Sequence, residues 1–187
     1  MDHYIDIQLL PDPEFPATLL MNALFAKLHR GLVALGSGNI GVSFPEVEDN
    51  PHGLGQKLRL HGSHSVLEQL TRLSWQQGMA DHLRQQAIRP VPETRSFRTV
   101  RRVQAKSNPE RLRRRLMKRK GYDEKQALAA IPDSTAERLN LPYIMLTSQS
   151  TGQKFPLFIE HGPLRDQPVS GKFSSYGLSA EATVPWF

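Results

Sequence analysis

The sequence contains no cysteine, and this absence removes several kinds of chemistry at once. A chain without cysteine forms no disulfide, binds no metal through thiolates and has no cysteine nucleophile. The sequence also lacks an apolar run near the roughly 20 residues that cross a bilayer, and its N-terminus has no basic segment followed by a long apolar one. We therefore expect a cytoplasmic protein with no membrane partner.

Residue patterns typical of metal sites and phosphate-binding loops are also missing. The acidic residues are scattered and form no DxD or HExxH pattern, and the sequence has no GxxxxGK[ST] loop. The seven histidines show no metal-ligand spacing beyond His61 and His64, which we expect in a loop at the end of a strand. An enzyme with this sequence is expected to work without a metal or any other cofactor.

Positive charge is present, and it is concentrated in one segment. The 187 residues include 24 Lys and Arg and 18 Asp and Glu, a net charge of +6. Residues 101–120 contain ten basic side chains and one acidic one, a local charge of +9. The other residues contain 14 basic and 17 acidic side chains, a charge of −3. This distribution indicates a mildly acidic globule that meets a polyanionic partner at one place.

The basic segment predicts a helix over 109–120. Asn108 is a favourable N-cap residue, Pro109 suits the first helical position and Gly121 is placed to end the helix. Because only Glu110 is available for ion pairs within the helix, nucleic acid binding is favoured over a merely solvated charged helix. Five cations recur at intervals of three and four and therefore share one face: Arg111, Arg114, Arg115, Lys118 and Arg119.

The remaining hydrophobic patterns predict an α+β fold. The order β, α, β, β, α, β is that of a ferredoxin-like (βαββαβ) domain, which we expect over 1–95. A smaller C-terminal domain over 96–187 is expected to contain the basic helix and a β-hairpin over 143–159. The predicted strands are 4–9, 40–44, 57–61 and 97–104, and the predicted helices are 16–35 and 66–73, with a further helical turn within 79–86. A short helix capped by Asp123 and ended by Pro132, and a strand within 171–178, complete the prediction.

Residues suited to RNA cleavage occur, although their patterns leave alternatives open. Cleavage without a metal requires a base for a ribose 2′-OH, and imidazole titrates near neutral pH. His29 lies near the end of the first predicted helix, where its spacing by itself favours an ordinary boundary histidine. The hydroxyl-rich stretch 147–152 can hold a ribose or phosphate oxygen, but it also suits a hairpin turn. Tyr176 and Phe155 are compatible with core positions or with RNA contacts.

Longer blocks of sequence resemble one protein family, the repeat-processing endoribonucleases of type I-F CRISPR systems, or Cas-six-f (Csy-four) family. The blocks span the chain, and the longest is the most specific. They are MDHYIDIQLLPDPEFP, KLHRGL, IGVSFP, RVQAKSNPERLRRRLMKR, SQSTGQKF, LFIEHGPL, SYGLS and VPWF.

The resemblance implies roles for residues in the matching blocks. His29 would be the catalytic histidine, Ser148 would position the nucleophilic ribose hydroxyl, and Tyr176 would support the histidine. Ser150 would be a further contact in the same site. The N-terminal domain would thus contain the catalytic histidine.

The resemblance also implies how a stem-loop would be bound. Arg102 and Gln104 would read bases, because Arg can pair bidentately with guanine and Gln with adenine. Phe155 would stack beneath the terminal base pair of the stem, and cations of the basic helix would contact the RNA backbone. Lys118 replaces an Arg of better-known members, so it keeps the charge but loses the bidentate fork.

The implied activity is metal-independent cleavage of precursor crRNA at the 3′ base of the CRISPR-repeat stem-loop. Attack by the 2′-OH would give a 2′,3′-cyclic phosphate, and the protein would retain the crRNA within a surveillance complex containing other subunits. One alternative is a non-catalytic hairpin-RNA-binding subunit of the same complex. Another is a basic DNA-binding protein.

Overall fold

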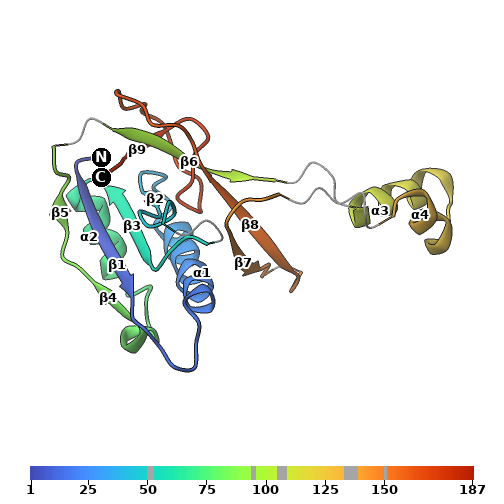
Figure 1. The fold of residues 1–187 in the computed structure, drawn as a ribbon, viewed down its shortest axis with the longest axis horizontal. Coiled ribbons are helices and arrows are strands. Elements are labelled where there is room, and N and C mark those ends of the chain that lie inside the picture. The colour runs from blue at the N-terminus through green and yellow to red at the C-terminus, as the bar shows by residue number, and fades with distance from the viewer. Residues whose placement is uncertain (50–52, 94–95, 105–108, 133–138, 150) are drawn as a thin grey trace. The chain divides into compact units, whose positions relative to one another are not determined.

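The computed structural model describes residues 1–49, 53–93, 96–104, 109–132, 139–149 and 151–187 (Figure 1). The fold is α+β, with two antiparallel sheets, four α-helices and one 3-10 helix among these residues. It comprises two compact units, Met1–Arg102 with Leu141–Phe187, and Val103–Asn140. The division into a ferredoxin-like domain over 1–95 and an RNA-binding domain over 96–187 stays a prediction. None of the helices in these described segments is long and apolar enough to span a bilayer.

The first sheet has the strand order β2-β3-β1-β4, with β5 also paired to β1. The pairings of β1 with β3, β4 and β5 and of β2 with β3 are antiparallel. Strand β1 alternates buried apolar residues with polar ones, as its sequence predicts, and Ile5 and Ile7 are almost completely buried. The strands are β1 (His3–Leu9), β2 (Gly41–Ser43), β3 (Lys57–Gly62), β4 (Leu83–Gln85) and β5 (Arg89–Pro90).

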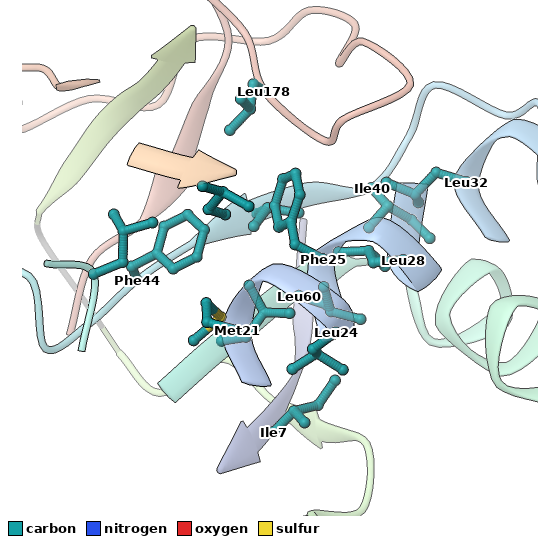
Figure 2. Close-up of a cluster of buried hydrophobic side chains, with 14 of the residues drawn as sticks. Ile7, Met21, Leu24, Phe25, Leu28, Leu32, Ile40, Phe44, Leu60 and Leu178 are labelled. Atoms are coloured by element: carbon teal, nitrogen blue, oxygen red, sulfur yellow. The ribbon is translucent and has the colours of Figure 1, made fainter. Parts of the chain in front are cut away.

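The helix α1 (Ala17–Leu35) packs its apolar face against this sheet. Figure 2 shows Leu24, Phe25 and Leu28 of α1 inside the main hydrophobic cluster. The helix ends at Gly36, which has φ 64° and donates its backbone N–H to the Leu32 carbonyl, as the sequence predicts. A second helix, α2 (His64–Arg72), begins at Ser63, whose side chain accepts from the Val66 N–H.

The second sheet has the order β7-β8-β6-β9. The predicted hairpin is confirmed, with Tyr143 opposite Phe158 and Thr147 opposite Lys154. Buried residues of this sheet, including Ile144 and Leu157, belong to the same hydrophobic cluster as those of the first sheet. The strands are β6 (Phe97–Val103), β7 (Tyr143–Thr147), β8 (Lys154–His161) and β9 (Thr183–Pro185).

Three local predictions differ in part or in full from the structure. In the predicted helical turn over 79–86, only the 3-10 helix η1 (Ala80–His82) is helical, and the following strand β4 pairs with β1. The predicted strand over 97–104 exists, but it lies in the second sheet. Residues 171–178 form no strand, since their backbone bonds to the loop before β2 and closes a tight turn.

The second compact unit contains the predicted basic helix, α3 (Pro109–Lys120), and the short helix α4 (Glu124–Ala130). Gly121 follows α3 with φ 66°, and its N–H donates to the Met117 carbonyl. Asp123 and Gln126 form the capping box of α4. Arg113 of α3 donates from Nε to the Ile131 carbonyl at 2.7 Å, which ties the two helices together.

Candidate active site

His29 lies on the side of α1 next to the buried face, and its imidazole is half-buried. Its Nδ1 is 2.9 Å from the carbonyl oxygen of Ser175, a residue 146 positions away in the chain. A carbonyl only accepts hydrogen bonds, so this contact requires the proton on Nδ1. Neutral His29 therefore has its lone pair on Nε2, where it can accept a proton from a substrate.

The ring of Tyr176 lies flat against the His29 imidazole. Their centroids are 4.1 Å apart and their planes differ by 10°. Tyr176 is also stacked with Phe25 of α1, with centroids 6.5 Å apart and planes that differ by 5°. The imidazole is thus held by one hydrogen bond and one stacking contact, which together restrict its rotation.

The turn that carries Ser175 and Tyr176 is fixed by backbone hydrogen bonds. The Gly177 N–H donates to the Ser174 carbonyl at 2.8 Å, and the Val42 N–H donates to the Gly177 carbonyl at 2.9 Å. Gly177 has φ 70°, and a Cβ added there would lie 2.3 Å from Cγ2 of Val42. This position therefore requires glycine for both its conformation and its space.

Ser148 shares a pocket of about 370 Å³ with His29 and Tyr176. It lies just after β7, where its Oγ accepts from the Thr151 N–H at 3.3 Å. Strand β7 is tied to α1 because the Met145 N–H donates to Oδ1 of Asn22 at 2.9 Å. The nine lining residues are Ala26, His29, Arg30, Leu146, Thr147, Ser148, Gln149, Phe155 and Tyr176.

Two further predicted contacts lie at this pocket. Phe155 is half-buried and lines it. Arg102 is exposed near the end of β6, with its guanidinium carbon 5.8 Å from the ring centroid of Phe155 and 5.9 Å from that of Tyr176. The sequence patterns alone did not indicate that a cation would lie over these two rings.

The other predicted contacts that the structure describes do not line this pocket. Gln104 is exposed and belongs to the second compact unit, while Ser150 lies outside the described residues. On α3, the leucines Leu112 and Leu116 are half-buried, whereas the cations predicted to share one face are exposed. These five cations are Arg111, Arg114, Arg115, Lys118 and Arg119.

Several residues of the pocket were not predicted from the sequence. Arg30 occurs in the matching block KLHRGL and Thr147 in the hydroxyl-rich stretch, but neither residue was assigned a role. Gln149 lies in the same stretch, and Ala26 had no recognised signal, although position 26 lies one helical turn before His29. The carbonyl of Ser175 could not be identified, because any residue supplies the same acceptor.

Two other histidines lie away from the pocket, His61 buried and His161 half-buried. Burial, with a smaller contribution from the Arg59 charge, lowers the pKa of His61 to about 3. Its Nε2 is 2.8 Å from the Oγ of buried Ser43. Burial and the Arg98 charge lower the pKa of His161 to about 4. Among the residues with described positions, no three His, Asp or Glu side chains are grouped to hold a metal ion.

Comparisons with known proteins match almost the whole chain. A family described as "CRISPR-associated protein (Cas_Csy4)" matches residues 4–187. The chain is 52% identical to the CRISPR-associated endonuclease Cas6/Csy4 of Pseudomonas aeruginosa (strain UCBPP-PA14) over 187 residues, which is 100% of both chains. It is 51% identical to the protein of the same name from Escherichia coli (strain UTI89 / UPEC), with the same coverage.

These matches place the chain in the class of CRISPR-associated proteins. Within that class, the chain belongs to the Cas_Csy4 family.

Proposed function

We propose that this chain is an endoribonuclease that binds the stem-loop of CRISPR-repeat RNA and cleaves at the 3′ base of the stem without a metal. Both full-length relatives are named CRISPR-associated endonucleases, which supports the activity. The observation that carries the mechanism is the orientation of His29, whose Nδ1 faces a carbonyl. The basic face of α3 supports a polyanionic substrate.

In the proposed reaction, Nε2 of His29 removes the proton from the ribose 2′-OH. The 2′ oxygen then attacks the adjacent phosphorus in line, and the bond from phosphorus to the 5′ oxygen breaks. The leaving oxygen takes a proton from solvent, so the products are a 2′,3′-cyclic phosphate and a 5′-hydroxyl. Ser148 positions the ribose, and most of the rate enhancement comes from holding these groups in line.

The proposed RNA contacts extend from this pocket. Phe155 would stack beneath the last base pair, and Arg102 and Gln104 would read bases from the major groove. The position of Arg102 over the Phe155 ring supports its role beside the terminal pair. The groove of an A-form stem is narrow, but it opens at a helix end. The cations of α3 would contact the RNA backbone, with Lys118 contributing less than an arginine.

We further propose that the N-terminal part is a ferredoxin-like domain. The sheet order β2-β3-β1-β4, with α1 between β1 and β2 and α2 between β3 and β4, supports this assignment. The RNA-binding part would be the smaller C-terminal domain. After cleavage in the cytoplasm, the protein would retain the crRNA and join other subunits in a surveillance complex, so we expect one cut per molecule. Multiple turnover with excess substrate would contradict retention.

The decisive experiment uses the repeat hairpin RNA in excess chelator. We expect cleavage at the stem base with a 2′,3′-cyclic phosphate on the upstream product. A 2′-deoxyribose at the cleavage point should abolish cutting and leave binding intact, and persistent cutting would exclude 2′-OH attack.

A His29→Ala variant separates the enzyme from the non-catalytic alternative. We expect cleavage to fall by about a hundredfold or more, the range associated with a lost general base, with hairpin affinity unchanged. Unchanged cleavage would identify His29 as merely structural. Equal competition by duplex DNA would favour the DNA-binding alternative.

A further inference from the structure

A second hollow lies beside the candidate active site, between α1 and the turn that follows α2. It has a volume of about 470 Å³. We call it the α1 groove and define it by Lys27, Arg30, Gly31, Trp75 and Gln77 among its lining residues. We propose that the α1 groove binds the nucleotides immediately 3′ of the scissile phosphate. This inference rests on the proposed function.

The two hollows share a wall. Arg30 lines both the pocket that contains His29 and the α1 groove. Lys27 and Arg30 are three positions apart and therefore lie on neighbouring parts of one helix face. An RNA strand with its reactive phosphate at His29 can pass Arg30 and continue into the groove without leaving the protein surface.

The groove has the charge expected of a phosphate-binding surface. Its lining contains two cations, and no acidic residue is among the lining residues that the structure describes. Arg30 is exposed, and the Nζ of Lys27 donates to the Gln77 carbonyl at 2.7 Å. That bond holds the ammonium at the wall of the groove, and an ammonium has two further donors for phosphate oxygens.

Trp75 supplies an aromatic surface in the same groove. It is half-buried and backs onto α1, where a Cβ added at Gly31 would lie 3.0 Å from the Trp75 Cβ. The turn that presents it is closed by a hydrogen bond from the Gln77 N–H to the Ser74 carbonyl at 3.1 Å. An aromatic ring beside cations is a combination that binds single-stranded nucleic acid with little sequence preference.

The RNA segment 3′ of the cleavage point fits the groove better than the segment 5′ of the stem, because of how each is connected to the scissile phosphate. It continues covalently from the phosphate placed at His29, whereas the 5′ segment begins on the opposite strand of the stem. Cleavage then frees this segment from the retained stem. The groove therefore strengthens binding of the uncut RNA only, and helps to hold the scissile phosphate before cleavage.

The test compares affinities for non-cleavable RNAs with a 2′-deoxyribose at the cleavage point. The three ligands are the bare hairpin, the hairpin with an oligouridine 3′ extension and the hairpin with the same extension at its 5′ end. We expect the 3′ extension to tighten binding by about fivefold or more, the effect of stacking at least one base. The ratio of the affinity for the 3′-extended hairpin to the affinity for the bare hairpin should fall toward one in a Lys27→Gln/Trp75→Leu variant.

An Arg72→Gln variant is the matched control. Arg72 is exposed on α2 and paired with Glu68, and it does not line the α1 groove, so the ratio should stay at its normal value. If the double variant fails to fold, crosslinking keeps the inference testable. A 5-bromouridine placed 3′ of the scissile phosphate should crosslink to Trp75 in the unaltered protein.

Each result gives a clear decision. If the 3′-extended and bare hairpins bind the unaltered protein equally tightly, the inference is overturned. A crosslink only outside the groove also overturns it. Equal tightening by the 5′ extension, lost in the same variant, overturns the assignment to the 3′ segment. Failure of the bare hairpin to bind instead contradicts the proposed function itself.

Discussion

At the scale of single residues, Gly177 fixes the position of the Ser175 carbonyl, and that carbonyl orients His29. A Gly177→Ala change places a methyl group against Val42 in a left-handed backbone conformation. We expect the free energy of unfolding to fall by about 1–3 kcal/mol from this strain. The Ser175 carbonyl should also move away from His29, so cleavage should slow more than hairpin binding weakens. Urea unfolding and single-turnover cleavage measure the two effects.

Gly36 provides the matched control for this prediction. It has a similar φ of 64°, but the nearest atom to an added Cβ is 3.9 Å away. Gly36→Ala should therefore cost only the conformational strain, about 1 kcal/mol, and leave cleavage unchanged. Equal cleavage by both variants would contradict a positioning role for the 174–177 turn.

Tyr176 makes a second prediction at this scale, because its contact with His29 is a ring stack. Tyr176→Phe keeps the ring and should retain most of the cleavage rate. Tyr176→Leu removes the ring, and the rate should fall by about two- to tenfold, the equivalent of an aromatic pair. A large loss in Tyr176→Phe would instead assign the role to the phenolic hydroxyl. Single-turnover rates at saturating protein measure the effect apart from binding.

The candidate site could be predicted from sequence only where a residue's type limits its chemistry. His29 and Ser148 were candidates because imidazole and hydroxyl groups suit proton transfer and ribose contacts. Their proximity was implied by the family resemblance and not by spacing. The hydrogen bond from His29 to Ser175 crosses 146 positions and uses a backbone group. No local pattern reports such a contact.

At the scale of elements, α3 presents a set of exposed cations and a half-buried side toward α4. An Arg114→Ala/Arg115→Ala variant should bind the hairpin less tightly, and the slope of log affinity against log salt should become shallower by about 2, roughly one for each lost phosphate contact. Arg72→Ala, which removes a cation of α2, should leave the slope unchanged. An unchanged slope in the double variant would exclude these arginines from the backbone contacts.

Elements with strong local signals were predicted well. The basic helix α3 begins with Pro109 and is followed by Gly121, and α1 has a continuous apolar stripe ended by Gly36. The predicted N-cap residue Asn108 lies outside the described residues. The failures concern elements defined by distant partners. β4 is a strand because β1 offers it a pairing edge, and 171–178 is held as a loop by Gly38 and Val42. The placement of β6 in the second sheet likewise depends on pairing with strands that are distant in sequence.

At the scale of the whole molecule, the N-terminal and C-terminal segments share buried charged groups. Arg59 of β3 forms two hydrogen bonds with the carboxylate of Asp6 on β1 and donates to the carbonyl of Phe187 at 2.7 Å. Its guanidinium carbon also lies 4.0 Å from the Phe187 ring centroid. His61 lies in the same strand, β3, and its Nδ1 has no hydrogen-bond partner among the described residues. A proton added to this histidine would face the Arg59 charge.

The stability of the fold should therefore fall as the pH is lowered below about 6.5. The pKa values of His61 and His161 are about 3 and 4 in the folded protein, below the ordinary value of 6.5. Between these limits the unfolded chain binds more protons than the folded one, so protonation favours unfolding. At pH 5 each histidine should reduce the free energy of unfolding by about 2 kcal/mol relative to pH 7. Urea unfolding at the two pH values measures this change, and His161→Gln should remove about half of it. An unfolding free energy that is equal at pH 7 and pH 5 would mean that neither histidine is kept neutral by burial.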